Sequence, residues 1–424
     1  MRNSTKDNMP RGLRPVKRIE LSEKNFKMRV ILAVVLLVVG FVAIGYAVSG
    51  WLKVDSGWST IEVNSKELNC GEDFVFTYNI GAGERSASNE KKALTALYSD
   101  ASVKAYKLFD RYQSFEGTVN IHTINTHINQ TLEVDQVLYD AFELFEKNQS
   151  RYLYFGALHS EYYNLFFGYE DSPISEEFDP YTNEETAELF EALAEYANNA
   201  EHIDLELLGD RKVILKVSDE YRAFAEENGI EVFIDFFRLK NAFVVDYLAN
   251  TMIENGFTYG SVSSYDGFAR NLDGRGNSYA LNFFDLTENE LFIAAKMTYK
   301  GRKSIVAFRS YPMGEIDSYW FYESEVSGKI IPPYVNSEGL YETAVDTITA
   351  YSSELGCAEV ALGIIPLYVS EELDTDSLNE LCDNGIYSLW EKNETIYYND
   401  FELDLGELYQ GYGVKYEKSF AGTP

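Results

Sequence analysis

The sequence contains few cysteines and few histidines for its length of 424 residues. Its three cysteines, Cys70, Cys357 and Cys382, show no CxxC spacing, which excludes a disulfide framework and a four-ligand zinc site and allows one disulfide at most. The four histidines are scattered along the chain. His122 and His127 lie five residues apart, which does not place both on one face of a helix, so surface or loop positions suit them better than a metal pair.

Basic residues are also scarce, because 36 Lys and Arg stand against 68 Asp and Glu and leave a formal net charge of -32. Such a charge repels phosphate backbones at long range, so no nucleic acid is expected as a partner. The P-loop, GxGxxG, HExxH and GxSxG motifs are absent as well. Apolar residues are plentiful: with 46 % hydrophobic and 15 % aromatic residues, the chain can bury a large core.

The N-terminal charge pattern predicts a membrane anchor. Residues 1–29 carry nine basic and three acidic side chains, whereas Val30–Leu52 contains no charged residue. This apolar run is long enough for a helix to cross about 30 Å of hydrocarbon. Because a basic flank stays on the cytoplasmic side, we expect a cytoplasmic tail (1–29), a transmembrane helix (30–52), a stem (53–60) and an extracytoplasmic domain (61–424).

A cleaved signal peptide is the alternative interpretation of Val30–Leu52. The run exceeds a typical signal-peptide core, and its end, AVSGWLKVD, is only a modest cleavage site. No cysteine lies near the span, which excludes a lipoprotein anchor. The expected location is therefore the cell membrane, crossed once, with the N-terminus in the cytoplasm; these features would suit a cell-envelope protein of a bacterium.

Helical and strand-like patterns alternate after the span without a long linker, which indicates one large α+β domain with mostly antiparallel strand pairing. The spacing predicts helices over Lys91–Phe115, Leu132–Asn148, Glu184–Asn198, Lys240–Glu254 and Leu340–Leu355. It predicts strands over Val213–Val217, Tyr259–Ser263, Tyr279–Phe284, Leu291–Tyr299, Ser304–Tyr311, Tyr319–Tyr322, Val360–Tyr368, Ile386–Trp390 and Ile396–Tyr398.

Seven segments, taken in order, resemble the motifs of a known family. They are KLFDRY at Lys107–Tyr112, FELFEKNQSRYLYFGALHSEYYNLFFG at Phe142–Gly168, DFFRLKNAFVVDYLANTMIENG at Asp235–Gly256, SVSSYDGFARN at Ser261–Asn271, SEVSGKI at Ser324–Ile330, AVDTITAYSSELG at Ala344–Gly356 and IYSLWEKNETIYYND at Ile386–Asp400. Their order and spacing, more than their identities, resemble the FAD:protein FMN transferases, also called the thiamine biosynthesis lipoprotein family. The resemblance implies that family's α+β fold for the extracytoplasmic domain.

The same resemblance implies a flavin site. Members of the family bind FAD, use Mg²⁺ and move FMN onto a Thr or Ser of a partner, here expected to be a membrane or envelope protein. Tyr112 aligns with the family's flavin-stacking tyrosine, and Asp235 aligns with its adenosine-binding aspartate. Asn241 aligns with a position where the family has lysine. Asp346 stands at a metal-binding aspartate. Without the family, Tyr112 could complete the apolar face of its helix, Asp235 could cap the next helix, and Asp346 could be solvent-exposed.

Several family positions are replaced in this chain. Phe237 and Arg238 stand where the family has two glycines, Tyr154 replaces an aspartate, and Ala350 replaces a threonine. Side chains at the glycine positions would crowd a backbone that approaches a diphosphate closely. Only one of the expected metal ligands is retained, so the resemblance leaves catalytic activity open.

Three functions therefore stay open. The first is an FAD:protein FMN transferase, and the second is a noncatalytic protein of the same fold that binds flavin or holds a partner at the membrane surface. The third is a structural surface protein, in which Phe236 and Phe237 would fill the junction between Tyr112 and Asp235.

Overall fold

The computed structural model describes residues 55–65, 68, 70–83, 85–167, 177–287, 290–315, 317–324, 330–411 and 413–422. Within these ranges no helix is both long and apolar enough to span a membrane. The predicted tail and transmembrane helix lie outside them. Asp55–Pro424 forms one compact unit in which helices and strands are mixed, as the sequence predicts for the main domain.

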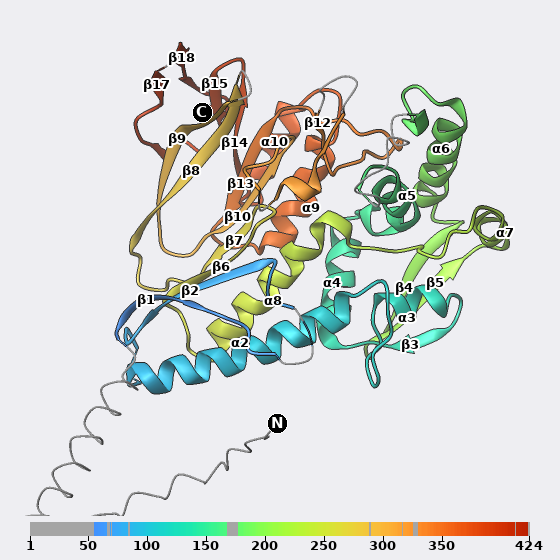
Figure 1. Cartoon of the computed structure of the whole chain (residues 1–424), viewed down its shortest axis with the longest axis horizontal. Helices are drawn as coiled ribbons and strands as arrows, with labels where there is room; N and C mark the ends of the chain where they lie inside the picture. The colour runs from blue at the N-terminus through green and yellow to red at the C-terminus, as the bar shows by residue number, and fades with distance from the viewer. Residues whose placement is uncertain are drawn as a thin grey trace, which may run out of the picture. The chain divides into compact units, whose positions relative to one another are not determined.

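A nine-stranded sheet forms the centre of this unit (Figure 1). In spatial order its strands are β1 (Gly57–Ile61), β2 (Phe74–Ile80), β6 (Gly260–Ser264), β7 (Phe268–Asn271), β10 (Ser304–Arg309), β13 (Thr347–Ser352), β14 (Tyr387–Lys392), β15 (Thr395–Tyr398) and β19 (Glu417–Phe420). Neighbouring strands are antiparallel except β15 and β19, which are parallel. Residues 57–60, predicted as stem, form most of β1 and pair with β2.

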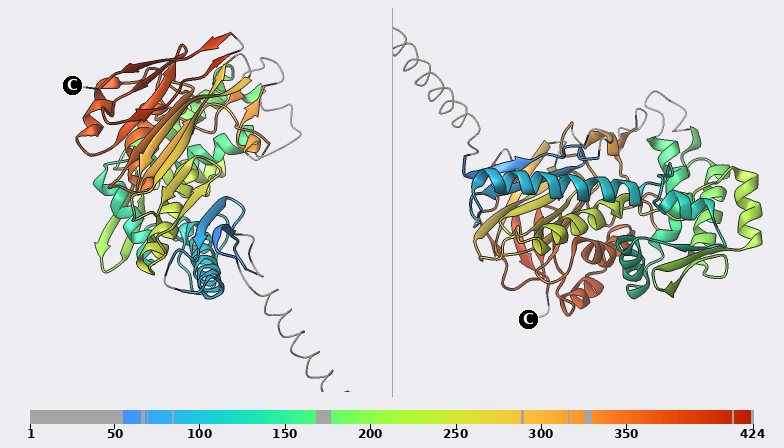
Figure 2. Two further views of the ribbon diagram at one scale, coloured as in Figure 1. Left: turned by 90° about the vertical axis from the view of Figure 1, so that its left-hand side faces the viewer. Right: turned by 90° about the horizontal axis from the view of Figure 1, so that it is seen from below.

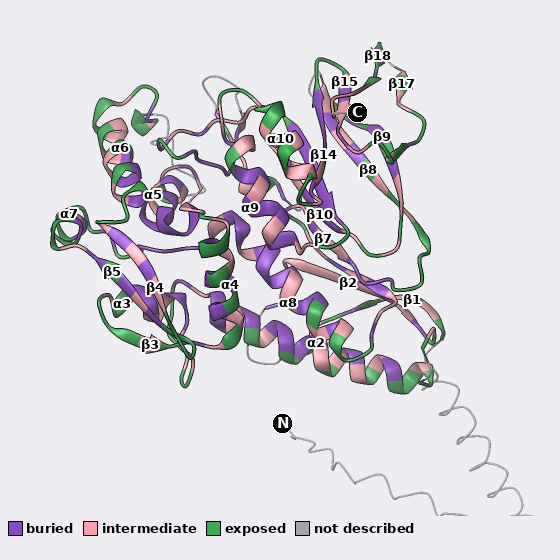
Figure 3. Ribbon diagram, turned by 180° about the vertical axis from the view of Figure 1, so that it is seen from behind, coloured by how far each residue is buried: buried purple, intermediate pink, exposed green. Residues whose placement is uncertain are grey.

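Helices cover one face of this sheet. Helices α2 (Ala87–Phe109) and α8 (Lys240–Glu254) lie side by side, and α9 (Cys357–Tyr368) packs against α8 and β10 (Figure 2). The short helix α10 (Thr375–Cys382) follows α9 and contacts β14. Figure 3 shows that α8 and α9 are mostly buried, which fits helices that lie between a sheet and other elements.

A smaller sheet of β8 (Ser278–Thr287), β9 (Glu290–Lys300) and β16 (Asp404–Leu405) covers the other face. Side chains of β10 show the two faces: Ile305 joins a core cluster with Phe283 of β8, whereas the Phe308 ring lies 5.4 Å from Tyr368 of α9. Ile305 and Phe308 lie three positions apart in β10, and side chains an odd number of positions apart in a strand point to opposite faces. Because both faces are covered, all six residues of β13 are buried.

Most of the remaining elements gather on one side of the central sheet, whereas β17 and β18 lie on the other side, near β9 and β15 (Figure 1). The remaining elements include α3 (Ile121–Thr126), β3 (Thr131–Glu133), α4 (Gln136–Lys147), η1 (Tyr152–Phe155), α5 (Gly156–Phe166), α6 (Glu184–Asn198), β4 (Ile203–Gly209), β5 (Lys212–Val217), α7 (Asp219–Asn228), η3 (Phe237–Leu239), η4 (Ser318–Trp320), β11 (Tyr322–Glu323), β12 (Ile330–Ile331), β17 (Gln410–Gly411) and β18 (Val414–Lys415). Strands β3, β5 and β4 form a separate antiparallel sheet.

The predicted helix Leu340–Leu355 is wrong, and so is the predicted strand Val360–Tyr368. The first segment contains the central strand β13, and the second lies in helix α9. A strand buried on both faces loses its alternating pattern, and a helix buried on nearly all sides loses its polar face, so periodicity does not separate the two. The predicted strand Tyr319–Tyr322 is also mostly wrong, because Ser318–Trp320 forms a short 3-10 helix.

Candidate functional site

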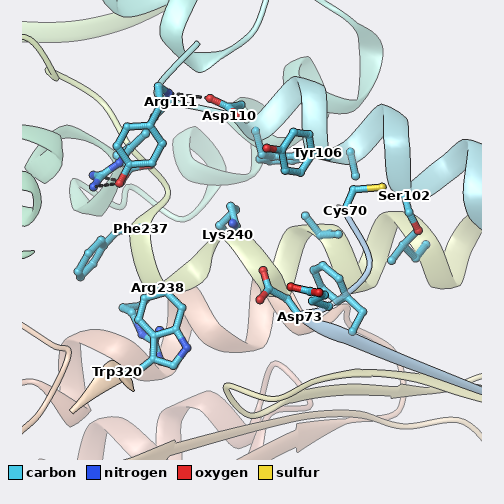
Figure 4. Close-up of a pocket in the computed structure, with 18 of the residues that line it drawn as sticks. Cys70, Asp73, Ser102, Tyr106, Asp110, Arg111, Phe237, Arg238, Lys240 and Trp320 are labelled. Carbon is cyan, nitrogen blue, oxygen red and sulfur yellow. Dashed lines mark hydrogen bonds and ion pairs between the residues drawn. The ribbon is translucent and has the colours of Figure 1, made fainter. Parts of the chain in front are cut away.

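A cavity of about 370 Å³ lies beside α2 and the start of α8 (Figure 4). Its volume is within the range of about 300 to 1,000 Å³ found for small-molecule sites. The lining includes Tyr112, Asp235, Arg238, Lys240 and Trp320. The cavity therefore brings together two of the residues predicted for a flavin site.

Arg111 joins Tyr112 to Asp235. Its Nη1 donates a hydrogen bond of 2.7 Å to Asp235 Oδ2, and its Nη2 donates one of 2.7 Å to the Tyr112 hydroxyl. Both members of the Arg111 and Asp235 ion pair are buried, whereas Tyr112 is 69 % exposed. Asp235 thus forms an ion pair across the cavity wall, and no side chain caps η3 or α8. Arg111 was not predicted, although it directly precedes Tyr112.

A turn after α2 sets the direction of the Tyr112 side chain. The helix ends at Phe109, and Asp110 Oδ1 then accepts hydrogen bonds from the backbone N–H groups of Tyr112 (2.7 Å) and Gln113 (2.9 Å). Such a turn reverses the chain after a helix, as is typical of Asp. Tyr112 therefore lies beyond the helix and does not complete its apolar face.

Two cations follow Asp235 in the same short segment. Arg238 is 5 % exposed, and its guanidinium carbon lies 4.0 Å from the centre of the Trp320 ring. Within the described ranges Arg238 forms no ion pair, and its Nε has no hydrogen-bond partner. Lys240 also lines the cavity, where Figure 4 places it between Phe237 and Asp73. Neither Arg238 nor Trp320 was predicted; the replacement of a family glycine by arginine was the available signal.

Phe236 and Phe237 have different roles. Phe236 is buried in a cluster of phenylalanine rings behind the cavity. Phe237 lines the cavity, and its ring stacks on His159 with centroids 4.4 Å apart. Its φ of 43° lies in the left-handed region, which glycine adopts without strain. The backbone thus keeps a conformation suited to the family's glycine, while the cavity remains open beside the ring.

Replacing Phe237 tests this backbone strain. We expect Phe237→Gly to be more stable than Phe237→Ala by about 1 kcal/mol, because both variants lose the ring and only glycine relieves the left-handed conformation. Urea unfolding of the two variants measures the difference. Equal stability, or a more stable alanine variant, would contradict the strain.

His159 is buried behind Phe237. It is 1 % exposed, its ring lies 4.7 Å from Tyr152, and within the described ranges neither ring nitrogen has a hydrogen-bond partner. Burial, with the positive charge of Arg111 adding to it, holds the pKa of His159 well below its usual value. The ring is therefore neutral and acts as an apolar surface for Phe237.

This neutral histidine predicts a pH dependence of stability. Below about pH 6.5 the His159 ring binds a proton in the unfolded chain but stays neutral in the folded chain. The free energy of unfolding therefore decreases as the pH falls below this value. We expect a loss of up to about 1.4 kcal/mol per pH unit from this group. His159→Phe should remove that part of the dependence when urea unfolding is compared near neutral and acidic pH. An unchanged slope would show that His159 takes up its proton in the folded state.

The other two predicted site residues lie elsewhere. Asn241 is buried on α8, does not line the cavity, and its Nδ2 donates a hydrogen bond of 2.9 Å to Asp266 Oδ2. Asp346 is exposed just before β13, and its Oδ1 accepts a hydrogen bond of 2.8 Å from the Ser310 hydroxyl. It is not on a helix, because the predicted helix around it is a strand.

The residues present do not fit the expected Mg²⁺. Across the described ranges, no group of three or more His, Cys, Asp or Glu side chains is placed to hold a metal ion. Asp346 shares no cavity lining with Tyr112 and Asp235. The three cysteines are free thiols, and Cys357 is buried at the start of α9. No step through a metal ion is therefore derived for this site.

No protein-family model and no curated protein matches the sequence. Among solved structures, the ApbE protein from Thermotoga maritima is similar over 78 % of this chain and 94 % of its own, with a TM-score of 0.52 and 13 % identity. A mutant of the flavin transferase ApbE from Vibrio cholerae matches over 78 % of this chain and 92 % of its own, with a TM-score of 0.45 and 14 % identity. The apo flavinyl transferase ApbE from Pseudomonas stutzeri matches over 80 % of this chain and 92 % of its own, with a TM-score of 0.46 and 12 % identity. The similarity to the Thermotoga protein shows that this chain has the fold of the ApbE proteins, as its motifs predict.

Proposed function

We propose that this protein binds FAD in the cavity beside α2 and α8, as a membrane-anchored protein whose main domain lies outside the cytoplasm. One observation carries the proposal: Tyr112 and Asp235, predicted from segments far apart in the sequence, line the same cavity and both bond to Arg111. The similarity in fold to the ApbE protein from Thermotoga maritima supports it, together with the motifs that resemble the FAD:protein FMN transferases.

The lining offers complementary groups for a flavin nucleotide. Tyr112 presents an exposed aromatic ring on which the flat isoalloxazine ring can stack. Arg238 and Lys240 supply positive charge for phosphate groups, and guanidinium is well suited to phosphate. The Asp235 carboxylate accepts from Arg111 through Oδ2, so its Oδ1 can accept a hydrogen bond from the adenosine part.

Calorimetric titration of FAD into the full-length chain in detergent tests this proposal. We expect binding, and we expect Tyr112→Ala to weaken it about 10-fold, as is typical for the loss of one aromatic stacking partner. Tyr112→Phe keeps the ring and is the matched control, which should bind nearly as well as the parent. Absence of binding at tens of micromolar FAD would contradict the proposed function.

Transfer of FMN to a Thr or Ser of a membrane or envelope protein is the second candidate function. The motifs favour it, because they resemble those of the FAD:protein FMN transferases, and the chain shares the fold of the ApbE protein from Thermotoga maritima. The described residues do not favour it, because among them no group of three or more His, Cys, Asp or Glu side chains is placed to hold a metal ion. We therefore place binding before transfer.

Release of AMP from FAD in the presence of Mg²⁺ separates the two functions. A protein that only binds FAD releases none. Turnover that Asp346→Asn abolishes would assign Asp346 a metal role and would favour the transferase.

A further inference from the structure

Arg238 is a buried cation in the wall of the cavity. Arg111 is paired with Asp235, and Asp110 Oδ1 is occupied by two backbone N–H groups. Arg238, in contrast, is 5 % exposed and has no ion pair within the described ranges. A buried guanidinium without a counterion is costly, so an anion that enters the cavity would gain from this charge.

The surroundings of Arg238 fix its orientation. The guanidinium lies 4.0 Å from the Trp320 ring and 5.9 Å from the Tyr334 ring. Stacking occupies the flat face of a guanidinium and leaves its N–H groups at the edge free to donate hydrogen bonds. One of these, Nε, has no partner among the described residues.

Carboxyl groups lie near Arg238, but none of them forms an ion pair with it within the described ranges. Asp266 lies close enough for Arg238 to lower its pKa, but burial is the larger effect and raises the pKa of Asp266 above its usual value. Asp73 and Glu72 line the cavity without forming an ion pair to Arg238. Lys240 lines the same cavity two residues further along the chain and adds a second cation.

We propose that Arg238, together with Lys240, binds the phosphate groups of the ligand and takes over the charge neutralisation that a metal ion would supply. The ligand class is a phosphate ester or diphosphate, bound without a divalent cation. The inference rests on the proposed function in naming a flavin nucleotide as this ligand. It assigns a role to a residue that stands where the related family has glycine.

The backbone at Phe237 supports this assignment. Its left-handed φ of 43° is retained although the residue is not glycine, and its ring is held against His159. Strained backbone of this kind persists where the surroundings enforce it, often at binding sites. The conformation directs the following residue, Arg238, toward Trp320 and the cavity.

The test compares FAD, FMN and riboflavin on the full-length chain, each in EDTA and in Mg²⁺. We expect FAD and FMN to bind more tightly than riboflavin, with the same affinity in EDTA and in Mg²⁺. Arg238→Gln should weaken FAD and FMN binding about 10 to 100-fold, the usual range for a hydrogen bond to a charged group, and leave riboflavin unchanged. Arg238→Lys should retain part of the affinity. Retained riboflavin binding shows that each variant is folded.

Arg275→Gln is the matched control, because Arg275 also lies on an aromatic ring, 3.5 Å from the centre of Tyr259, but does not line the cavity. It should leave all three affinities unchanged. Binding of FAD that requires Mg²⁺, or equal binding of FMN by the parent and by Arg238→Gln, would overturn the inference and leave flavin binding intact.

Inorganic pyrophosphate distinguishes this inference from the proposed function. Its binding can be followed by the fluorescence of Trp320, which lies against Arg238. If no flavin binds but pyrophosphate binds in EDTA and Arg238→Gln abolishes it, the anion site stands and the flavin proposal fails. If inorganic phosphate binds as tightly as pyrophosphate, the site serves a single phosphate group. If neither flavin nor pyrophosphate binds, both proposals are overturned.

Discussion

Asp235→Ala should lower the free energy of unfolding by about 3 to 5 kcal/mol, the range measured when one member of a buried ion pair is removed. The Arg111 and Asp235 side chains are only 8 % and 6 % exposed, and their atoms lie 2.7 Å apart. Without Asp235 the Arg111 guanidinium stays buried without a counterion, beside the Tyr112 hydroxyl and the rings of Tyr112 and Tyr163. The variant should therefore also lose the position of Tyr112 and, with it, flavin binding.

Urea unfolding measures this loss, and an exposed ion pair provides the control. Lys216 and Glu206 are paired at the surface, with side chains 51 % and 39 % exposed. Glu206→Ala should cost about 1 kcal/mol or less. The double variant Arg111→Met with Asp235→Leu should recover much of the stability, since apolar replacement removes both charges. A loss in Asp235→Ala no larger than in Glu206→Ala would contradict the buried pair.

Phe236→Ala should lower the free energy of unfolding by about 3 to 5 kcal/mol, as is typical for truncation of a buried phenylalanine. The ring centre of Phe236 lies 4.9 Å from Phe109, 6.0 Å from Phe142, 5.4 Å from Phe145 and 4.9 Å from Phe243. These four residues belong to α2, α4 and α8, so the cavity left by truncation would weaken the contact among three helices.

The matched control is Phe401, which is 84 % exposed. Phe401→Ala should change stability little, because its ring already contacts solvent. Thermal unfolding of both variants checks the prediction. A small effect of Phe236→Ala would show that the core can close over the missing ring, and the wall of the cavity would then be less rigid than its packing indicates.

Local patterns were sufficient for some elements. The bounds of α6 (Glu184–Asn198) and α8 (Lys240–Glu254) agree with the prediction, because each keeps a helical spacing of apolar residues. The strands predicted over Ile386–Trp390 and Ile396–Tyr398 correspond to β14 and β15, which pair antiparallel. The segments Leu340–Leu355 and Val360–Tyr368 were assigned wrongly, because β13 in the first is buried on both faces and α9 in the second is buried on most sides.

The candidate site was predictable only in part. The positions of Tyr112 and Asp235 came from the family motifs, and the structure places both in one cavity. The Arg111 ion pair and the stacking of Arg238 on Trp320 depend on contacts between residues far apart in sequence, which spacing does not reveal. Asp346 aligned with a metal ligand, but among the described residues no group of three or more His, Cys, Asp or Glu side chains is placed to hold a metal ion.

A crystal structure of the chain grown with FAD in EDTA tests the central claim most directly. We expect density for the isoalloxazine ring next to Tyr112 and for phosphate oxygens within hydrogen-bond distance of Arg238. FAD bound at another surface, or an empty cavity at saturating FAD, would contradict the claim that this cavity is a flavin site.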